Sequence, residues 1–412
     1  MFSVHQHWDP LQVCAVGRSY PPEFYSFIEN TKVRSVLERI AIETEEDYQK
    51  LIKILKSFNV TVVRNDISEN REDHFWAEHY SPPPMVPRDH TVMIGEKFYM
   101  PGAEFGYNIF DNVSGFQEEF SILQSNNKLT SKQKIRFNEK LQRALVNRKI
   151  NRQKGYLEKV KSILRSINHN PLTTFPNNKK FNTFGSIEKF LKDHNTEIIY
   201  DKYVSGATTT RVGKDIYIGT VVRDEIGTDC FNEYLRFIKN SLGPDYRIHI
   251  VNCGTHSDGV FTPVKPGLII SLNDIQTYSK TFPDWEVVYL PEQSFAKIKP
   301  FMDLKKKNKG KWWVPGEELN DDFTDFVESW LKDWVLYVEE TVFDVNMLII
   351  NPTNVIVNNY NKNVFDAFDR HGITAHICNF RHRYFWDGGL HCITSDLSRE
   401  GTMQDYFPER NK

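Results

Sequence analysis

The first 65 residues combine short apolar runs with one longer periodic stretch. Residues 8–17 open with a turn and continue as an apolar strand that ends at a glycine. Residues 31–58 place apolar side chains at helical spacing. The β-branched run at 60–63 favours a second strand. The pattern therefore predicts a strand–helix–strand unit.

Hairpin patterns of the same kind recur along the rest of the chain. Two short apolar strands meet at a turn in each of residues 91–100, 208–219, 256–270 and 345–357, and the stretch 386–396 closes the series. Helical patterns lie between them at 187–194, 229–241, 323–334 and 363–371. About five strand–helix–hairpin units indicate a repeat that closes on itself. A mixed open α/β sheet is the competing architecture.

Composition fits a globular protein with one large domain or two ordinary ones, since 412 residues are 40% hydrophobic and 26% charged. The net charge of −2 conceals a basic stretch at 128–180, with 15 Lys and Arg against two acids. We interpret residues 1–412 as a single domain with a basic helical insertion at about 112–185. Without aromatic interleaving, a solvated helical face over the active-site mouth or a partner subunit is favoured over a nucleic-acid surface.

The five cysteines argue against a disulfide framework or a structural zinc site, because their number is odd and no Cys-x-x-Cys spacing occurs. A reducing compartment, and hence the cytoplasm, is the simplest interpretation. The N-terminus lacks the pattern of a signal peptide, and no run approaches the roughly 20 apolar residues of a membrane helix. No membrane partner is expected.

Reactive side chains stand where the hairpins begin or turn: Asp89, Asp215, His256, Asp258 and Cys392. Two carboxylates can grip a planar guanidinium with charge-assisted hydrogen bonds, which leaves its central carbon open to a thiolate. An imidazole can then protonate the departing amine. This set therefore suits attack on a cationic carbon.

Each of these residues also has a structural interpretation. Cys392 can be a buried small hydrophobe, as most free cysteines are. Asp89 and Asp215 lie in sequences typical of surface turns, and His256 can be a loop histidine with satisfied hydrogen bonds. Metal binding by His256 and Asp258 has little support, because no third candidate ligand lies at a sequence spacing typical of metal sites.

Residues 388–396 (Gly-Gly-Leu-His-Cys-Ile-Thr-Ser-Asp) resemble the nucleophile motif of amidinotransferases, in particular the arginine:glycine and arginine:inosamine-phosphate enzymes. Residues 256–261 resemble their catalytic His-x-Asp segment. Residues 87–89 and 213–216 are similar to their other two acidic motifs, and residues 8–11 to their opening. The matches keep their order along nearly the whole chain outside 110–185.

This resemblance implies an α/β fold, the five-bladed α/β-propeller of pseudo-fivefold ββαβ units. It also implies ping-pong amidino transfer, for which no metal or organic cofactor is expected. Cys392 would attack the guanidinium carbon of a donor, with arginine expected, and His256 would protonate the leaving amine, so that ornithine departs. Asp89 and Asp258 would hold the guanidinium, and Asp215 would orient His256. Arg211, in the strand before Gly213, joins the substrate-binding candidates.

Two departures bear on the second substrate. The arginine expected after the His-x-Asp strand is missing from residues 271–276, and Glu339-Glu340 stand where the arginine:glycine enzymes have paired serines. Acids there attract an amine and repel a carboxylate. We therefore expect an acceptor other than glycine, such as a polyamine, a lysine-like amine or an amino sugar.

Two rival functions stay open. A hydrolase of the same fold would use the same Cys, His and acids with water in place of the amine. A non-catalytic protein would bind a partner through the basic insertion. The expected partners are otherwise small-molecule substrates, and a homodimer is the assembly considered.

Overall fold

The structure, a computed structural model, divides the chain into two compact units, one of Met1–Ile67, Pro82–Gly102 and Thr183–Lys412 and the other of Ser68–Ser81 and Ala103–Asn182. It describes residues 2–69, 75–76, 79–80, 82–101, 182–201, 204–220, 229–252, 256–272, 278–290, 314–331, 334, 344–386 and 388–411. In the second unit these include the antiparallel strands β3 (Phe75–Trp76) and β4 (His79–Tyr80). Most of the basic insertion expected at 112–185, namely residues 112–181, lies outside the described residues, so the insertion stays a prediction.

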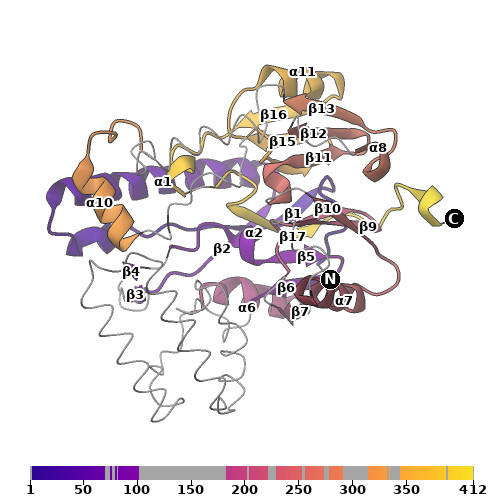
Figure 1. Ribbon diagram of the computed structural model, residues 1–412, viewed down its shortest axis with the longest axis horizontal. Coiled ribbons are helices and arrows are strands. Elements are labelled where there is room, and N and C mark those ends of the chain that lie inside the picture. The colour runs from indigo at the N-terminus through magenta and orange to yellow at the C-terminus, as the bar shows by residue number, and fades with distance from the viewer. Residues whose placement is uncertain are drawn as a thin grey trace, which may run out of the picture. The chain divides into compact units, whose positions relative to one another are not determined.

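Five three-stranded sheets build the described part of the first unit (Figure 1). In each sheet the central strand is antiparallel to one neighbour and parallel to the other. The strands, in sheet order, are β17 (Thr394–Arg399), β1 (Leu11–Val16) and β2 (Thr61–Arg64); β5 (Val92–Ile94), β6 (Lys97–Met100) and β7 (Glu197–Tyr200); β8 (Thr209–Val212), β9 (Asp215–Thr220) and β10 (Arg247–Asn252); β11 (Phe261–Lys265), β12 (Leu268–Leu272) and β13 (Glu286–Leu290); β14 (Leu348–Asn351), β15 (Asn354–Val357) and β16 (Thr374–Ile377).

In the order of the chain, a described helix lies between the central strand of each sheet and its parallel neighbour. This agrees with the crossover connection that a parallel pair needs, which is usually helical. These helices are α1 (Thr31–Ser57), α6 (Gly185–Asp193), α7 (Asp229–Leu242), α8 (Tyr278–Thr281) and α11 (Lys362–Arg370). The five repeated units expected from the sequence are therefore confirmed. The open mixed sheet is wrong for the described residues, where the strands form separate small sheets.

Two details differ from the sequence interpretation. The fourth crossover contains the single-turn helix α8. The sequence did not predict it, because four residues are too few to show a helical periodicity. The helix expected at 323–334 is α10 (Asp321–Trp330), which packs on α1 and does not connect two strands of a sheet. Asn320 caps α10 by accepting a hydrogen bond from the Phe323 amide.

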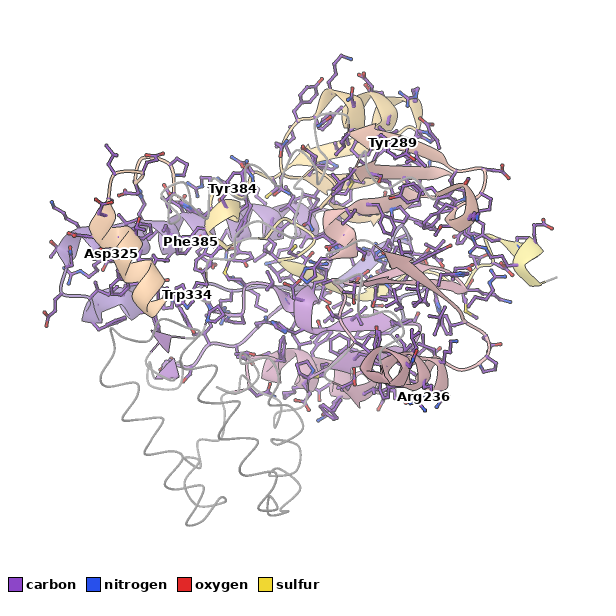
Figure 2. All side chains as sticks on the ribbon, in the orientation of Figure 1. Arg236, Tyr289, Asp325, Trp334, Tyr384 and Phe385 are labelled. Atoms are coloured by element: carbon purple, nitrogen blue, oxygen red, sulfur yellow. The ribbon has the colours of Figure 1, made fainter. Side chains whose placement is uncertain are left out.

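Aromatic packing around α10 supports the short helix α12 (Arg383–Trp386), which leads into the cysteine turn. Phe385 stacks on Phe323 of α10, with ring centroids 6.3 Å apart, and Trp334 stacks on Trp386 at 5.7 Å. Figure 2 shows Trp334 and Phe385 beside α10. These contacts hold Phe385 and Trp386 in place.

The two ends of the chain meet in the first sheet, because β17 pairs with β1. The register places Cys14 opposite Asp396 and Val16 opposite Thr394. The Gly17 amide also donates to the Ile393 carbonyl at 2.9 Å. The segment just before β17 is thereby fixed against the N-terminal strand.

Strand β17 is buried along its whole length although it contains an acid and a base. Asp396 accepts from Arg211 at 2.7 and 2.9 Å and from Arg399 at 2.6 Å. The arginines hold the pKa of Asp396 well below its usual range despite burial, which opposes them. One apolar core cluster includes buried side chains such as Tyr217, Phe261 and Ile269.

The remaining short helices are η1 (Pro22–Phe27), α2 (Pro87–His90), η6 (Ser257–Gly259) and η7 (Pro408–Asn411). Across the residues that the structure describes, no helix is both long enough and apolar enough to traverse a bilayer.

Candidate active site

The cysteine turn lies between α12 and β17 and depends on glycine. A Cβ added at Gly389 would lie 2.4 Å from Asn346 Oδ1, so only glycine allows this approach. The Ile393 amide donates to the Gly389 carbonyl, and the Thr394 hydroxyl donates to the Leu390 carbonyl at 2.9 Å. Cys392 therefore sits two residues before the strand, on a fixed turn, with a side chain only 1% exposed.

Asn346, two residues before β14, ties this turn to the acid of η6. Its Oδ1 accepts from the His391 amide at 2.9 Å and the Cys392 amide at 3.3 Å. Its Nδ2 lies 3.2 Å from Cys392 Sγ and 3.0 Å from Asp258 Oδ2. One buried side chain thus positions both the backbone and the sulfur of the cysteine.

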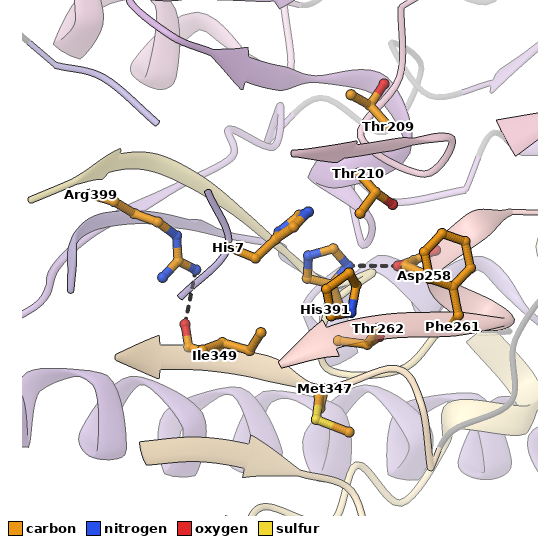
Figure 3. Close-up of a pocket in the computed structure, with 11 residues that line it drawn as sticks. His7, Thr209, Thr210, Asp258, Phe261, Thr262, Met347, Ile349, His391 and Arg399 are labelled. Carbon is orange, nitrogen blue, oxygen red and sulfur yellow. Dashed lines mark hydrogen bonds and ion pairs between the residues drawn. The ribbon is translucent and has the colours of Figure 1, made fainter. Parts of the chain in front are cut away.

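Asp258 lies in η6 and forms the anionic centre of the site. His391 Nδ1 lies 2.7 Å from its Oδ2 (Figure 3). Burial raises the pKa of this carboxyl, but the cation of Arg88 and the hydrogen bond from His391 outweigh it and lower the pKa to about 2. Burial also lowers the pKa of His391, against the pull of Asp258. At neutral pH the pair is therefore a carboxylate and a neutral imidazole that donates from Nδ1.

Arg88 brings a cation to the sulfur from the one-turn helix α2. Its Nη2 lies 2.9 Å from Cys392 Sγ and 3.0 Å from Asp89 Oδ1, and its Nη1 forms an ion pair with Asp258 Oδ2. Burial lowers the pKa of this guanidinium, but Asp258, the cysteine and Asp89 together raise it above its usual value. Arg88 is therefore a permanent cation.

Burial dominates the chemistry of the thiol itself. It raises the pKa of Cys392 to about 12, opposed by Arg88 and reinforced by Asp258 and Asp89. Even so, this cysteine differs from an inert buried one, because two N–H donors point at its sulfur. A group that stabilises the anion or accepts the proton is needed before the sulfur can act as a nucleophile.

His256 precedes η6 and is partly exposed. Its positive charge would lower the pKa of Asp258 and also that of His90, which places it within electrostatic reach of the carboxylate. The structure thus joins Cys392, Asp89 and Asp258 through Arg88 and Asn346, with His256 two residues from Asp258 in the chain.

Asp215 does not orient His256, and this sequence assignment is corrected. At the start of β9 its carboxylate accepts from Arg247 Nη2 at 2.6 Å, Arg410 Nη1 at 2.7 Å and His249 Nε2 at 2.5 Å. Strand β10 places Arg247 directly opposite Asp215, and η7 brings Arg410 back from the C-terminus. The Gly-Lys-Asp turn therefore supplies the acid of a separate ion cluster.

Arg211 also has a different place from the one expected. It is buried between Asp396 and His7, and its Nη1 donates to the Met93 carbonyl at 2.7 Å. These contacts make it part of the core. Glu339 and Glu340 lie outside the described residues.

Sequence reasoning left out Arg88, Asn346 and His391 as functional residues. Arg88 and His391 stood inside the matched motifs, so a test of every polar residue in those motifs would have found them. Asn346 gave no signal, because its partners are 88 and 46 residues away in the chain.

A small cavity with a mixed polar and apolar lining adjoins the His391–Asp258 pair (Figure 3). His7, Thr210, Met347 and Arg399 contribute to its lining. Among the described residues, no group of three or more His, Cys, Asp or Glu side chains is placed to hold a metal ion.

Similarity to known proteins supports the resemblance to the amidinotransferase family. No protein-family model matches the chain. The mitochondrial glycine amidinotransferase of Gallus gallus is 26% identical over 216 residues, which cover 50% of this chain and 41% of that protein. The L-arginine:L-lysine amidinotransferase of Pseudomonas savastanoi pv. phaseolicola is 22% identical over 214 residues, covering 50% and 48%. The match thus spans less than half the length of these relatives.

Two solved structures share the fold over nearly their whole length. SxtG, an amidinotransferase from Microseira wollei in the saxitoxin biosynthetic pathway, superimposes with a TM-score of 0.55 at 14% identity over 98% of this chain and 99% of its own. The inosamine-phosphate amidinotransferase StrB1 from Streptomyces griseus gives a TM-score of 0.55 at 15% identity over the same fractions. At these identities the likeness establishes the fold.

Proposed function

We propose that this chain is an amidinotransferase that moves an amidino group from a guanidino donor to an amine through a covalent amidino-cysteine at Cys392. The observation that carries the proposal is that Arg88 of α2 and Asn346 before β14 both contact the buried sulfur of Cys392 and both bind Asp258 of η6. The family resemblance of both sequence and fold supports it.

The charge of the site suits a cationic substrate. Asp89 and Asp258 carry two negative charges, Arg88 carries one positive charge, and the neutral His391 adds none. The excess of one negative charge favours a guanidinium over a neutral urea or a carboxylate. Asp258 Oδ1 is buried without a hydrogen-bond partner in the described part of the chain, so it can accept from a substrate N–H.

In the first half-reaction the Cys392 sulfur attacks the central carbon of the bound guanidinium. His256 takes the thiol proton and delivers it to the leaving amine as the carbon–nitrogen bond breaks. The amidino group stays on sulfur. In the second half-reaction the acceptor amine attacks that carbon, the carbon–sulfur bond breaks, and His256 removes the proton that the amine loses. Arginine is the expected donor, with ornithine as the product.

The acceptor is proposed to be an amine that has no carboxylate next to its amino group, unlike glycine. Glu339 and Glu340 would attract its positive charge, and residues 271–276 supply no arginine for a carboxylate. The five sheets, each with the same strand pairing, are proposed to close as the blades of a five-bladed α/β-propeller around this site.

Intact-mass analysis after mixing with arginine alone tests the first half-reaction. We expect a mass increase of one amidino group on the wild-type chain, release of ornithine, and no adduct on a Cys392→Ser variant. Addition of a panel of amines should then remove the adduct, with glycine a poor acceptor. Citrulline formation without any amine would instead identify a hydrolase. Failure of arginine and other guanidines to form either product would refute both activities.

A further inference from the structure

The guanidinium of Arg88 occupies the position beside the sulfur where two carboxylates converge. It uses one oxygen of each acid, namely Asp89 Oδ1 and Asp258 Oδ2. The same Nη2 that donates to Asp89 also lies 2.9 Å from Cys392 Sγ. A cation of the chain itself therefore contacts the nucleophile and both acids.

The stem of Arg88 is packed as a fixed part of the structure. Its side chain is only 3% exposed, and the Gly206 amide donates to its carbonyl at 3.0 Å. A Cβ added at Gly206 would lie 2.7 Å from Arg88 Cγ, so the stem fills a slot that a glycine leaves open. Such packing favours an arginine that stays in place while substrate binds.

Each acid keeps one oxygen for another partner. Asp258 Oδ1 and Asp89 Oδ2 have no hydrogen bond within the described ranges of the chain. A substrate cation can therefore bind the two remaining oxygens while Arg88 holds the other two. The carboxylates then have two roles at once, since they position the resident arginine and receive the substrate.

We propose that Arg88 is a catalytic residue of this site, whose guanidinium stabilises the thiolate of Cys392 by a direct hydrogen bond and remains there throughout the reaction. The proposal rests on the cysteine being the nucleophile of the proposed function, and it applies equally to transfer and to hydrolysis. A buried thiolate needs such a partner, because burial alone strongly disfavours its charge.

The test measures the rate at which iodoacetamide alkylates Cys392 at one fixed pH, resolved by peptide mass spectrometry. The thiolate is the reactive form, so the rate follows its population. Removal of an opposite charge at this distance changes a pKa by about one to three units, so Arg88→Met should slow the alkylation roughly 10- to 1,000-fold. Arg88→Lys keeps the charge without the fork and should slow it less.

Asp89→Asn is the matched variant of opposite sign. It removes a negative charge that disfavours the thiolate and leaves Arg88 in place, so alkylation should become faster. Buried Cys14 and Cys378 serve as internal controls for folding, because both should stay unreactive in any variant that keeps the native structure. If Arg88→Met makes Cys14 and Cys378 reactive, that variant has lost its native structure. The comparison of Arg88→Lys with Asp89→Asn then still shows whether positive charge beside Cys392 speeds or slows its alkylation.

An unchanged rate in a folded Arg88→Met protein would overturn the proposal. A faster rate would do so too, since it would mean that the arginine only shields the sulfur in the absence of substrate. The assay uses no guanidine, so its outcome is separate from that of the amidino-adduct experiment. If the alkylation rates change as expected but arginine forms no amidino adduct on Cys392, Arg88 keeps its proposed role and the proposed transfer activity is refuted.

Discussion

Two carboxylates of this protein are surrounded by the same kinds of side chains and yet do different things. Asp258 contacts Arg88 and His391, and Asp215 contacts Arg247, Arg410 and His249. Both lie at turns next to strands, and in both cases these contacts hold the pKa of the acid below its ordinary value against the effect of burial.

The difference lies in what each cluster leaves unpaired. Both oxygens of Asp215 accept hydrogen bonds, and two arginines balance Asp215 and Asp405. Around Asp258 one arginine faces two acids, and a thiol stands beside the arginine. One oxygen of each acid, Asp258 Oδ1 and Asp89 Oδ2, has no hydrogen bond among the described residues. A balanced and fully paired cluster fastens the chain, whereas an incomplete one can receive a substrate.

The largest effect is expected from Asp258→Asn. The change removes the charge that holds Arg88 and a substrate cation, and loss of one such electrostatic contact costs on the order of 100- to 1,000-fold in rate. Steady-state kinetics with arginine and a good amine acceptor would measure it. Retention of wild-type kcat/KM by Asp258→Asn would remove the distinction between the two clusters.

Asp215→Asn should lower the stability of the protein and leave its activity unchanged, in contrast to Asp258→Asn. Its carboxylate is completely buried, but its arginine partners are 18% exposed, so we expect a loss of about 2–3 kcal/mol in the free energy of unfolding, somewhat below the value for a fully buried pair. Activity per folded molecule should be unchanged. Urea denaturation and kinetics on the same preparation test both statements, with the more exposed Asp405→Asn as control, for which at most about 1 kcal/mol is expected.

The sequence allowed the five repeated units to be predicted, because strand runs, turns and helical spacing are local properties. It also allowed Cys392, Asp89 and Asp258 to be placed together through the order of the motifs. The position of Asp215 was wrong for a physical reason. The turn sequence shows that an acid lies at this position. The partners of that acid come from β10 and from the C-terminal η7, and no local sequence pattern predicts them.

The same reason explains why Asn346 was missed. It belongs to no motif, and its function arises only when the loop before β14 reaches the cysteine turn. Arg88 was assigned no role because the guanidinium was sought only in the substrate.

Asn346→Ala separates positioning of the nucleophile from ordinary stabilisation. It removes a donor to the sulfur and leaves the backbone amides of His391 and Cys392 without their acceptor, so we expect a roughly tenfold or greater loss of kcat together with about 1–3 kcal/mol of stability. Asn358→Ala is the control, since Asn358 is equally buried and donates to the Asn346 carbonyl at 3.2 Å. If both variants lose stability and kcat alike, Asn346 has no special part in the site.

The smallest effect concerns acid stability and tests whether the two clusters are independent. The pKa of Asp258 falls from 3.8 to about 2 on folding, so its contribution is complete above about pH 4 and is lost as the pH falls toward 2. Asp215 is shifted in the same direction and acts with the same sign. Urea denaturation at pH 5 and pH 3 should show that Asp258→Asn removes about 1–2 kcal/mol of this acid dependence. Asp215→Asn should also remove part of the acid dependence, because its carboxyl pKa is lowered in the folded protein as well. Since the hydrogen bonds and ion pairs described for the two carboxylates involve no common residue, the double variant should lose the sum of the two parts, and a clear departure from additivity would show that the clusters are coupled.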